Sequence, residues 1–301
     1  MSITDEEIEK IEEKAYLIRR TVIEMLTEAK SGHTAGPLGM ADIFTALYFH
    51  ILKHDPKNPD WEERDRLFLS NGHICPVRYA AMAHAGYFPV EECMTLRKFG
   101  SRLQGHPERD MLPGVETTSG PLGSGLSQAS GYALAARMPA RPDDSGRSGG
   151  DGKAFRIFCL MSDGEQEEGN TWEGAMFAGK YRLTNLTAVM DRNNIQIDGN
   201  TEDVMPLEPL DEKYRAFGWH VIPIDGHNIG QFVAACDEAK SIKEKPTLIL
   251  AHTTPGKGVP SIENDYRWHG NPPGKGPTDK IPADKQKEMF LKELEETRSM
   301  K

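Results

Sequence analysis

Two short motifs near the middle of the chain hold residue types that could bind a metal ion. The first is Ser162-Asp163-Gly164, and the second, Asn193-Asn194-Ile195, begins 30 positions after Asp163. A carboxylate, an amide carbonyl and a main-chain carbonyl supply only oxygen ligands, which suit Mg²⁺ or Ca²⁺ better than zinc. Mg²⁺ usually completes its coordination shell with substrate phosphates and water, and Gly164 lets an anion approach the backbone. The two motifs together therefore predict a site for a metal diphosphate.

Four histidines stand directly beside glycine in segments expected to be loops: His33, His73, His106 and His269. A single loop histidine is more often structural than catalytic. However, an imidazole has a pKa near neutrality, which suits it to moving protons on and off hydroxyl groups. Four such residues in one chain favour a functional role.

A glycine-rich run extends from Thr117 to Gly125 and leads into an Ala- and Gly-rich segment. Glycines at the start of a helix suit an anion held at the helix N-terminus. The same run could equally serve close packing of the helix against its neighbours, and the sequence alone leaves both interpretations open.

Alternating apolar and amphipathic segments must position these residues. Strands are expected over 66–70, 155–161, 186–190, 219–224 and 247–251, and helices over 168–181, 210–217 and 229–240. This alternation predicts an α/β fold, a mostly parallel central sheet with helices on both faces. Asp163 alone would be interpreted as a helix cap. It and Asn193, however, both follow predicted strands, where such sheets bind ligands.

The remaining segments extend this unit. Thr4 and Glu7 have the spacing of a capping box at the start of a long amphipathic helix. Further segments expected are helices over 4–30, 40–52 and 122–137, an exposed loop over 139–153, and a C-terminal loop and helix over 271–301, with the helix at 283–296. Without an internal repeat, this pattern predicts a single domain over 1–301.

Charge and cysteine content limit the possible functions. The chain has 46 acidic and 36 basic residues and a net charge of -10, which disfavours nucleic acid and anionic membranes as partners. Its four cysteines form no CxxC pair and are expected to be reduced thiols. No apolar run is long enough to span a bilayer, and the acidic N-terminus is unlike a signal peptide. We therefore expect a cytoplasmic protein.

In combination these motifs resemble the N-terminal, diphosphate-binding part of transketolase. The metal motifs are similar to the thiamine diphosphate signature Gly-Asp-Gly…Asn-Asn, with Ser162 in place of the first glycine, and residues 31–39 match Ser-Gly-His-Pro-Gly-x-Pro-x-Gly except at Thr34 and Ala35. The family's Asn-Gly-His, Gly-His-Pro-Glu, Thr-Gly-Pro-Leu-Gly and Ile-Asp-Gly elements correspond to 71–73, 105–108, 118–123 (with Ser119 inserted) and 197–199. The resemblance extends from about residue 10 to residue 275.

The resemblance implies thiamine diphosphate as cofactor, with Mg²⁺ that Ca²⁺ or Mn²⁺ could replace. Asp163, the Asn193 side chain and the Ile195 carbonyl would bind the metal, and Gly164 would let the diphosphate approach. Gly120, Pro121 and Leu122 would line the thiazolium and pyrimidine rings.

The resemblance also implies roles for the titratable residues. His73 and His269 would lie near the diphosphate and the substrate, and His106 would bond the C1 hydroxyl of the donor sugar. His33 and His269 would assist proton transfer on substrate hydroxyls. Glu168 would join a network of carboxylates across a subunit interface. Where some members of the family have a second histidine near His269, this chain has Tyr266.

A complete transketolase is about twice this length, and its second domain holds the cofactor's pyrimidine and supplies a catalytic glutamate. No second sheet-forming half is found in these 301 residues. The resemblance therefore implies the N-terminal subunit of a split transketolase of the pentose phosphate pathway. It would use sugar phosphates and be active only with a C-terminal partner subunit, in an α₂β₂ heterotetramer.

Three alternatives remain open at this point. The chain could belong to a split enzyme for a sulfonated or branched ketose, or to an enzyme like deoxyxylulose-phosphate synthase. His106 argues for transketolase over the latter, because in the family it serves a donor with a C1 hydroxyl. A non-catalytic, diphosphate-binding regulatory subunit is disfavoured, because the metal motifs, Glu168 and all four histidines are intact.

Overall fold

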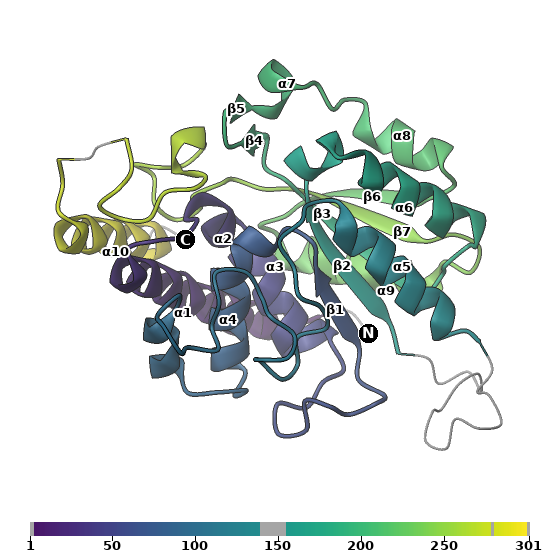
Figure 1. Ribbon diagram of the computed structural model, residues 1–301, viewed down its shortest axis with the longest axis horizontal. Helices are drawn as coiled ribbons and strands as arrows, with labels where there is room; N and C mark the ends of the chain where they lie inside the picture. Colours follow the sequence, from purple (N-terminus) through teal and green to yellow (C-terminus); the bar gives the residue numbers. More distant parts are fainter. Residues whose placement is uncertain (1–2, 139–154, 278–279, 300–301) are drawn as a thin grey trace.

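The computed structural model describes residues 3–138, 155–277 and 280–299, and the predicted loop 139–153 lies outside these ranges. Figure 1 shows a central sheet with helices on both sides. The strands are β1 Arg66–Leu69, β2 Ile157–Ser162, β3 Leu186–Arg192, β4 Ile195–Gln196, β5 Gly199–Asn200, β6 His220–Asp225 and β7 Thr247–His252. Five of them form a parallel sheet in the order β1-β2-β3-β7-β6, and β4 and β5 form a separate antiparallel hairpin. The predicted α/β fold and all five predicted strands are confirmed.

The helices have the following bounds. The longer ones are α1 Asp5–Ala29, α4 Cys75–His84, α5 Ser124–Ala135, α6 Gly169–Lys180, α9 Ile229–Ser241 and α10 Ala283–Ser299. The shorter ones are α2 Ala35–Gly39, α3 Ala41–Ala46, α7 Thr201–Val204 and α8 Leu210–Ala216, and single turns cover Leu47–Ile51, Gly72–Ile74, Val90–Thr95, Gly164–Glu167 and Tyr266–Trp268. Within the described ranges, no helix is sufficiently long and apolar to cross a membrane.

Local sequence signals explain where α1 begins and ends. Thr4 and Glu7 form the predicted capping box, with the Glu7 amide donating to Thr4 Oγ1 at 3.3 Å and the Thr4 amide donating to Glu7 Oε2 at 2.9 Å. The helix ends where Lys30 adopts a left-handed conformation. Two other predicted helices differ in detail. The one expected over 40–52 is α3 followed by a π turn, and the one expected over 122–137 begins at Ser124, because Gly123 has a positive φ.

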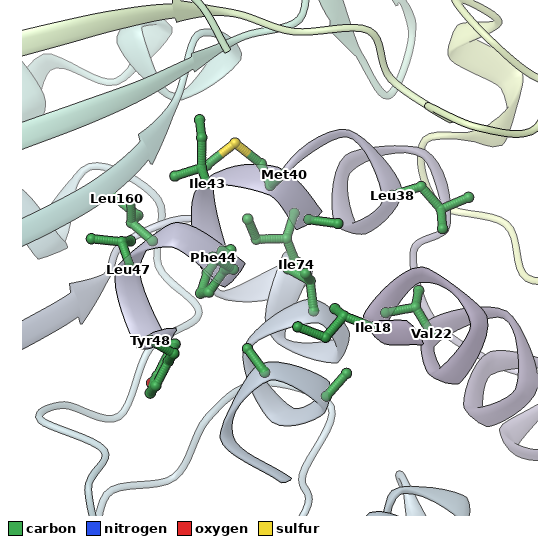
Figure 2. Close-up of a cluster of buried hydrophobic side chains, with 14 of the residues drawn as sticks. Ile18, Val22, Leu38, Met40, Ile43, Phe44, Leu47, Tyr48, Ile74 and Leu160 are labelled. Atoms are coloured by element: carbon green, nitrogen blue, oxygen red, sulfur yellow. The ribbon is translucent and has the colours of Figure 1, made fainter. Parts of the chain in front are cut away.

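Two apolar clusters hold the layers together, one on each face of the sheet. On one face the cluster joins residues of α1, α3, α4, α9 and α10 to those of the strands, with α10 packed on α1, and Figure 2 shows part of it around Ile18, Phe44 and Leu160. On the other face α5, α6 and α8 pack around Tyr214 and Trp219. Because both faces are covered, the central strands β2, β3 and β7 are mostly apolar and buried. The carboxyl ends of the parallel strands lie together at one edge.

Candidate active site

The two metal motifs meet at this edge because β2 and β3 are neighbouring parallel strands. Ser162 is opposite Asp191 in the register, and the Asp163 amide donates to the Asp191 carbonyl at 3.1 Å. The turn after β3 brings the Asn194 amide to 2.7 Å from Asp163 Oδ2, and Asn194 itself has a φ of 64°. The structure therefore brings Asp163 and the Asn193-Asn194-Ile195 segment together, as the sequence predicted.

The Asp163 carboxylate is fully buried and accepts hydrogen bonds from three groups. Gly164 N donates to Oδ1 at 2.8 Å, and Oδ2 accepts from Asn194 N and from Arg192 Nη1 at 2.9 Å. Burial raises the pKa of Asp163 to about 6, while the Arg192 guanidinium and the two amides oppose this rise. The charge on this carboxylate therefore depends on nearby cations and donors.

The Asn193 side chain is held by its neighbours. Its Nδ2 donates to Asp191 Oδ2 at 2.9 Å, and its Oδ1 accepts from Ile195 N at 3.0 Å. Burial raises the pKa of Asp191 to about 7, against the hydrogen bonds from Thr253 and Asn193. The oxygens of Asp163, Asn193 and Ile195 have the chemistry that Mg²⁺ prefers. No group of three His, Cys, Asp or Glu side chains suited to a metal is found among the described residues.

Three of the four predicted histidines form one cluster. The ring centroids of His33 and His73 are 4.8 Å apart, those of His73 and His269 are 5.2 Å apart, and those of His33 and His269 are 5.4 Å apart. His106 lies near the glycine-rich run, because a Cβ added at Gly120 would be 3.9 Å from its ring. Residues distant in the sequence thus converge at one place.

These imidazoles are held in their neutral form. Burial lowers the pKa of His33 to about 3, with His269, Arg97 and His106 acting in the same direction. Burial also lowers the pKa of His73 well below its ordinary value, and it lowers the pKa values of His269 and His106. A neutral imidazole has one donor and one acceptor nitrogen, so each ring of the cluster can both donate a hydrogen bond to a polar ligand and accept one from it.

The glycine-rich run passes beside this cluster. Gly120 has a φ of 155° and Gly123 a φ of 83°, conformations that favour glycine. Pro121 and Leu122 are exposed, and Leu122 is 37% accessible to solvent. The run therefore presents an apolar side chain and open backbone at the start of α5, where the resemblance predicts cofactor rings.

Several buried polar groups near the cluster have no hydrogen-bond partner among the residues that the structure describes. They are Nδ1 of His33, both side-chain polar atoms of Asn71 and the Ser119 hydroxyl. Ser119 lies against Gly72, because a Cβ at Gly72 would be 2.5 Å from Ser119 Oγ. Unpartnered buried polar atoms are unfavourable in a folded protein unless a ligand or water satisfies them. This location accordingly fits a polar ligand such as the predicted diphosphate cofactor.

Glu168 and Tyr266 both lie at the surface. Glu168 is exposed, and its Cβ would be 2.9 Å from a Cβ added at Gly123, so it borders the glycine-rich run. Tyr266 is 37% exposed, three residues before His269. The roles assigned to the site residues by resemblance stay predictions, although the structure brings the metal motifs, the histidines and the glycine-rich run to the carboxyl end of the sheet.

Two buried charged residues at the site were not predicted from the sequence. Arg192 bonds Asp163, Glu202 at 2.7 Å and Glu208 at 2.9 Å. Glu165 accepts hydrogen bonds from Ser70, Gly123 and Ser162, and burial raises its pKa. The sequence shows each of these charged residues at or just after an apolar strand, which could have marked it as a site residue. It does not show which distant groups form hydrogen bonds or ion pairs with it.

A parallel sheet with a carboxylate, an amide and several histidines at its carboxyl edge defines a cofactor-binding α/β protein of the thiamine diphosphate type. Residues 11–290 match the family described as "Transketolase, thiamine diphosphate binding domain". The chain belongs to this family.

Two relatives of nearly the same length are subunits of transketolases. The chain is 43% identical to the 6-deoxy-6-sulfo-D-fructose transketolase subunit SqwG of Clostridium sp. (strain MSTE9), over 86% of this chain and 90% of the relative. It is 36% identical to one of the subunits of the apulose-4-phosphate transketolase of Phocaeicola vulgatus, over 96% of this chain and 95% of the relative.

Solved structures of transketolases have the same fold over almost the whole chain. The transketolase from Leishmania mexicana superposes with a TM-score of 0.80 and 33% identity, covering 96% of this chain. This chain spans only 45% of the Leishmania protein. The predicted resemblance to the N-terminal part of transketolase is confirmed.

Proposed function

We propose that this chain is the N-terminal subunit of a two-chain transketolase that transfers a two-carbon ketol unit from a ketose phosphate to an aldose phosphate. The observation that carries this proposal is the match in length. The chain covers 90% and 95% of two relatives named as transketolase subunits, but only 45% of the Leishmania transketolase. Because both relatives of matching length are named as subunits, a second chain is part of this proposal.

Thiamine diphosphate and Mg²⁺ are the cofactors that fit the site. The oxygen atoms of Asp163, Asn193 and Ile195 would hold Mg²⁺, for which Ca²⁺ or Mn²⁺ could substitute. Gly164 leaves space for the diphosphate, since it has no side chain, and Gly120 to Leu122 would face the rings. When bound, thiamine diphosphate supplies the electron sink for breaking and forming the carbon–carbon bond.

The histidines would manage the hydroxyl groups of the sugars. His33 and His269 are neighbours, with ring centroids 5.4 Å apart, so one could take up a hydroxyl proton while the other orients the substrate. His106, beside Gly120, would bond the C1 hydroxyl of the donor. His73, whose ring centroid lies 4.8 Å from that of His33 and 5.2 Å from that of His269, would contact the diphosphate.

An apolar surface on α6 supports the requirement for a partner. Met176, Phe177 and Tyr181 are 51%, 37% and 42% exposed and lie on one face of the helix, which we call the α6 surface. Leu122 and Glu168 adjoin the start of the same helix. The loop Gly120–Leu122 thus lies at the start of α6 and the α6 surface near its end, which would suit a C-terminal subunit that carries the pyrimidine-binding domain and the catalytic glutamate, in an α₂β₂ assembly.

A second candidate function differs only in the sugar. Both relatives of matching length are named for uncommon substrates, 6-deoxy-6-sulfo-D-fructose and apulose 4-phosphate. A sulfonated or branched ketose is therefore the alternative donor to an ordinary sugar of the pentose phosphate pathway. A cytoplasmic location follows the same proposal, because such sugar phosphates are metabolites of the cytoplasm.

Reconstitution with the C-terminal chain tests this function. The purified chain alone should transfer no ketol unit, and addition of the partner with thiamine diphosphate and Mg²⁺ should restore transfer, with ordinary, sulfonated and branched ketoses compared as donors. Asp163→Ala should abolish the Mg²⁺-dependent part of cofactor binding. Robust turnover by the single chain would contradict the split-enzyme proposal, and cofactor binding without turnover on any ketose would favour a regulatory subunit.

A further inference from the structure

Glu165 is a buried carboxylate bonded only by neutral donors in the described part of the chain. Its side chain lies in the single turn after β2, and the residue is 1% exposed. Gly123 N donates to Oε1 at 2.5 Å, the Ser70 hydroxyl donates to the same oxygen, and Ser162 N donates to Oε2 at 3.2 Å. Two backbone amides and one hydroxyl, none with a formal charge, thus surround this carboxylate.

The three donors explain why the residue is an acid. Burying a carboxylate without a cation is unfavourable, and the bonds that compensate it are charge-assisted and stronger than neutral ones. A glutamine of the same shape has one oxygen and one NH₂ group. In Glu165→Gln, the side-chain NH₂ group would therefore face one of the N–H or O–H groups that now donate to the carboxylate. The negative charge of Glu165 therefore serves to hold the Gly123 amide, the Ser162 amide and the Ser70 hydroxyl in place.

The groups held by Glu165 belong to three separate segments. Ser70 follows β1, Ser162 ends β2, and Gly123 immediately follows the cofactor loop Gly120–Leu122. Ser70 Oγ in turn accepts from Gly125 N at 3.0 Å. The Glu165 carboxylate therefore bonds the Gly123 amide, and the Ser70 hydroxyl bonds the Gly125 amide. Together they hold both ends of the Gly123–Gly125 turn at the carboxyl edge of the sheet.

Glycine allows this attachment to be close. A Cβ at Gly125 would be 2.4 Å from Ser70 Cβ, and a Cβ at Gly123 would be 2.9 Å from Glu168 Cβ. The start of α5 thus lies directly on the end of β1 and against Glu168. Movement of Gly123 would displace both Leu122 and the surroundings of Glu168.

We propose that Glu165 is a positioning residue that anchors the Gly120–Leu122 loop to the ends of β1 and β2 in the geometry that receives the cofactor rings. The identity of the ligand rests on the proposed function. The anchoring itself rests on the hydrogen bonds of this chain alone. The two parts can consequently be tested separately.

Hydrogen–deuterium exchange of the full chain tests the anchoring without any cofactor. Glu165→Gln should increase exchange of the Gly123 and Gly125 amides by about tenfold or more, since losing one such bond is worth about 1–2 kcal/mol. The β3 and β7 amides should keep their protection. Glu212→Gln, which removes the same charge from an exposed position on α8, should change neither region. Unchanged exchange at residues 119–126 in Glu165→Gln would overturn the proposal.

Titration of thiamine diphosphate into the two-chain assembly with saturating Mg²⁺ tests the consequence. Glu165→Gln should weaken cofactor affinity by about tenfold, while assembly with the partner remains intact. If the wild type binds and Glu165→Gln binds equally well, this inference fails and the proposed function stands. If the wild type does not bind, the proposed function and the cofactor part of the inference both fail. Should Glu165→Gln not fold, Ser70→Ala removes one donor and the acceptor of Gly125 N, and must shift exchange and affinity in the same direction.

Discussion

At the scale of single residues, the clustered imidazoles connect the site to the stability of the chain. His73 is partly buried beside His33 and His269, and desolvation lowers its pKa well below the ordinary value of 6.5. The folded chain therefore holds this ring neutral at a pH where the unfolded chain protonates it. Proton uptake on unfolding makes the folded state less stable as the pH falls below 6.5.

Between about pH 7.5 and about pH 5.5 we expect His73 to lower the free energy of unfolding by about 1 kcal/mol, whereas the raised pKa values of the buried Asp163 and Asp191 act in the opposite direction. His73→Gln removes the titrating ring, so the change in its unfolding free energy from about pH 7.5 to about pH 5.5 should be more favourable than that of the wild type by about 1 kcal/mol. Urea unfolding at both pH values measures this difference. His252→Gln, at an exposed position at the end of β7, serves as the control and should follow the wild type. An identical pH dependence in His73→Gln would contradict the neutral-imidazole interpretation.

At the scale of helices and strands, backbone packing decides which glycines can be replaced. Gly179 lies near the end of α6, where a Cβ would be 1.9 Å from the carbonyl oxygen of Phe217. A Cβ added at Gly131, within α5, would meet no heavy atom within 4 Å beyond the helix's own backbone and the two neighbouring residues. The two positions differ in the space around them although both are helical glycines.

Gly179→Ala should therefore reduce the free energy of unfolding by about 1–3 kcal/mol, because backbone atoms must move to admit the methyl group. Gly131→Ala should raise it by up to about 1 kcal/mol, since alanine favours helix over glycine. Denaturant unfolding of both variants measures the effects. Equal effects of the same sign would show that the contact at Phe217 does not limit α6.

Among the helices and strands, the sequence could predict the positions of the central strands but not the partners of the buried charged residues. The runs at 155–161, 186–190 and 247–251 are mostly apolar, as is typical of strands buried on both faces, so their positions were predictable. The distant partners of Arg192 and Glu165 were not, because a hydrogen bond between residues far apart in sequence leaves no periodic signal. The histidines could be nominated from adjacent glycines. Their convergence depends on four loops whose paths only the fold determines.

At the scale of the whole molecule, the exposed groups at the site indicate that it is completed by another chain. Leu122, in the cofactor loop, and Glu168, beside it, are both exposed, and the α6 surface lies near the other end of α6. Phe177 and Tyr181 contact each other on this surface, with ring centroids 4.6 Å apart and ring planes tilted by 48°. A contiguous exposed apolar face beside a site is typical of a protein–protein interface.

Phe177→Glu should therefore prevent or strongly weaken assembly with the C-terminal subunit, because a carboxylate would be buried there without a partner. Met289→Glu is the matched control, since Met289 is 44% exposed on α10 and lies outside the α6 surface. Analytical ultracentrifugation of each variant mixed with the partner measures assembly, and thermal unfolding confirms that each chain is folded. If Phe177→Glu assembles like Met289→Glu, the α6 surface is not the contact with the partner, and the partner binds another face of the chain.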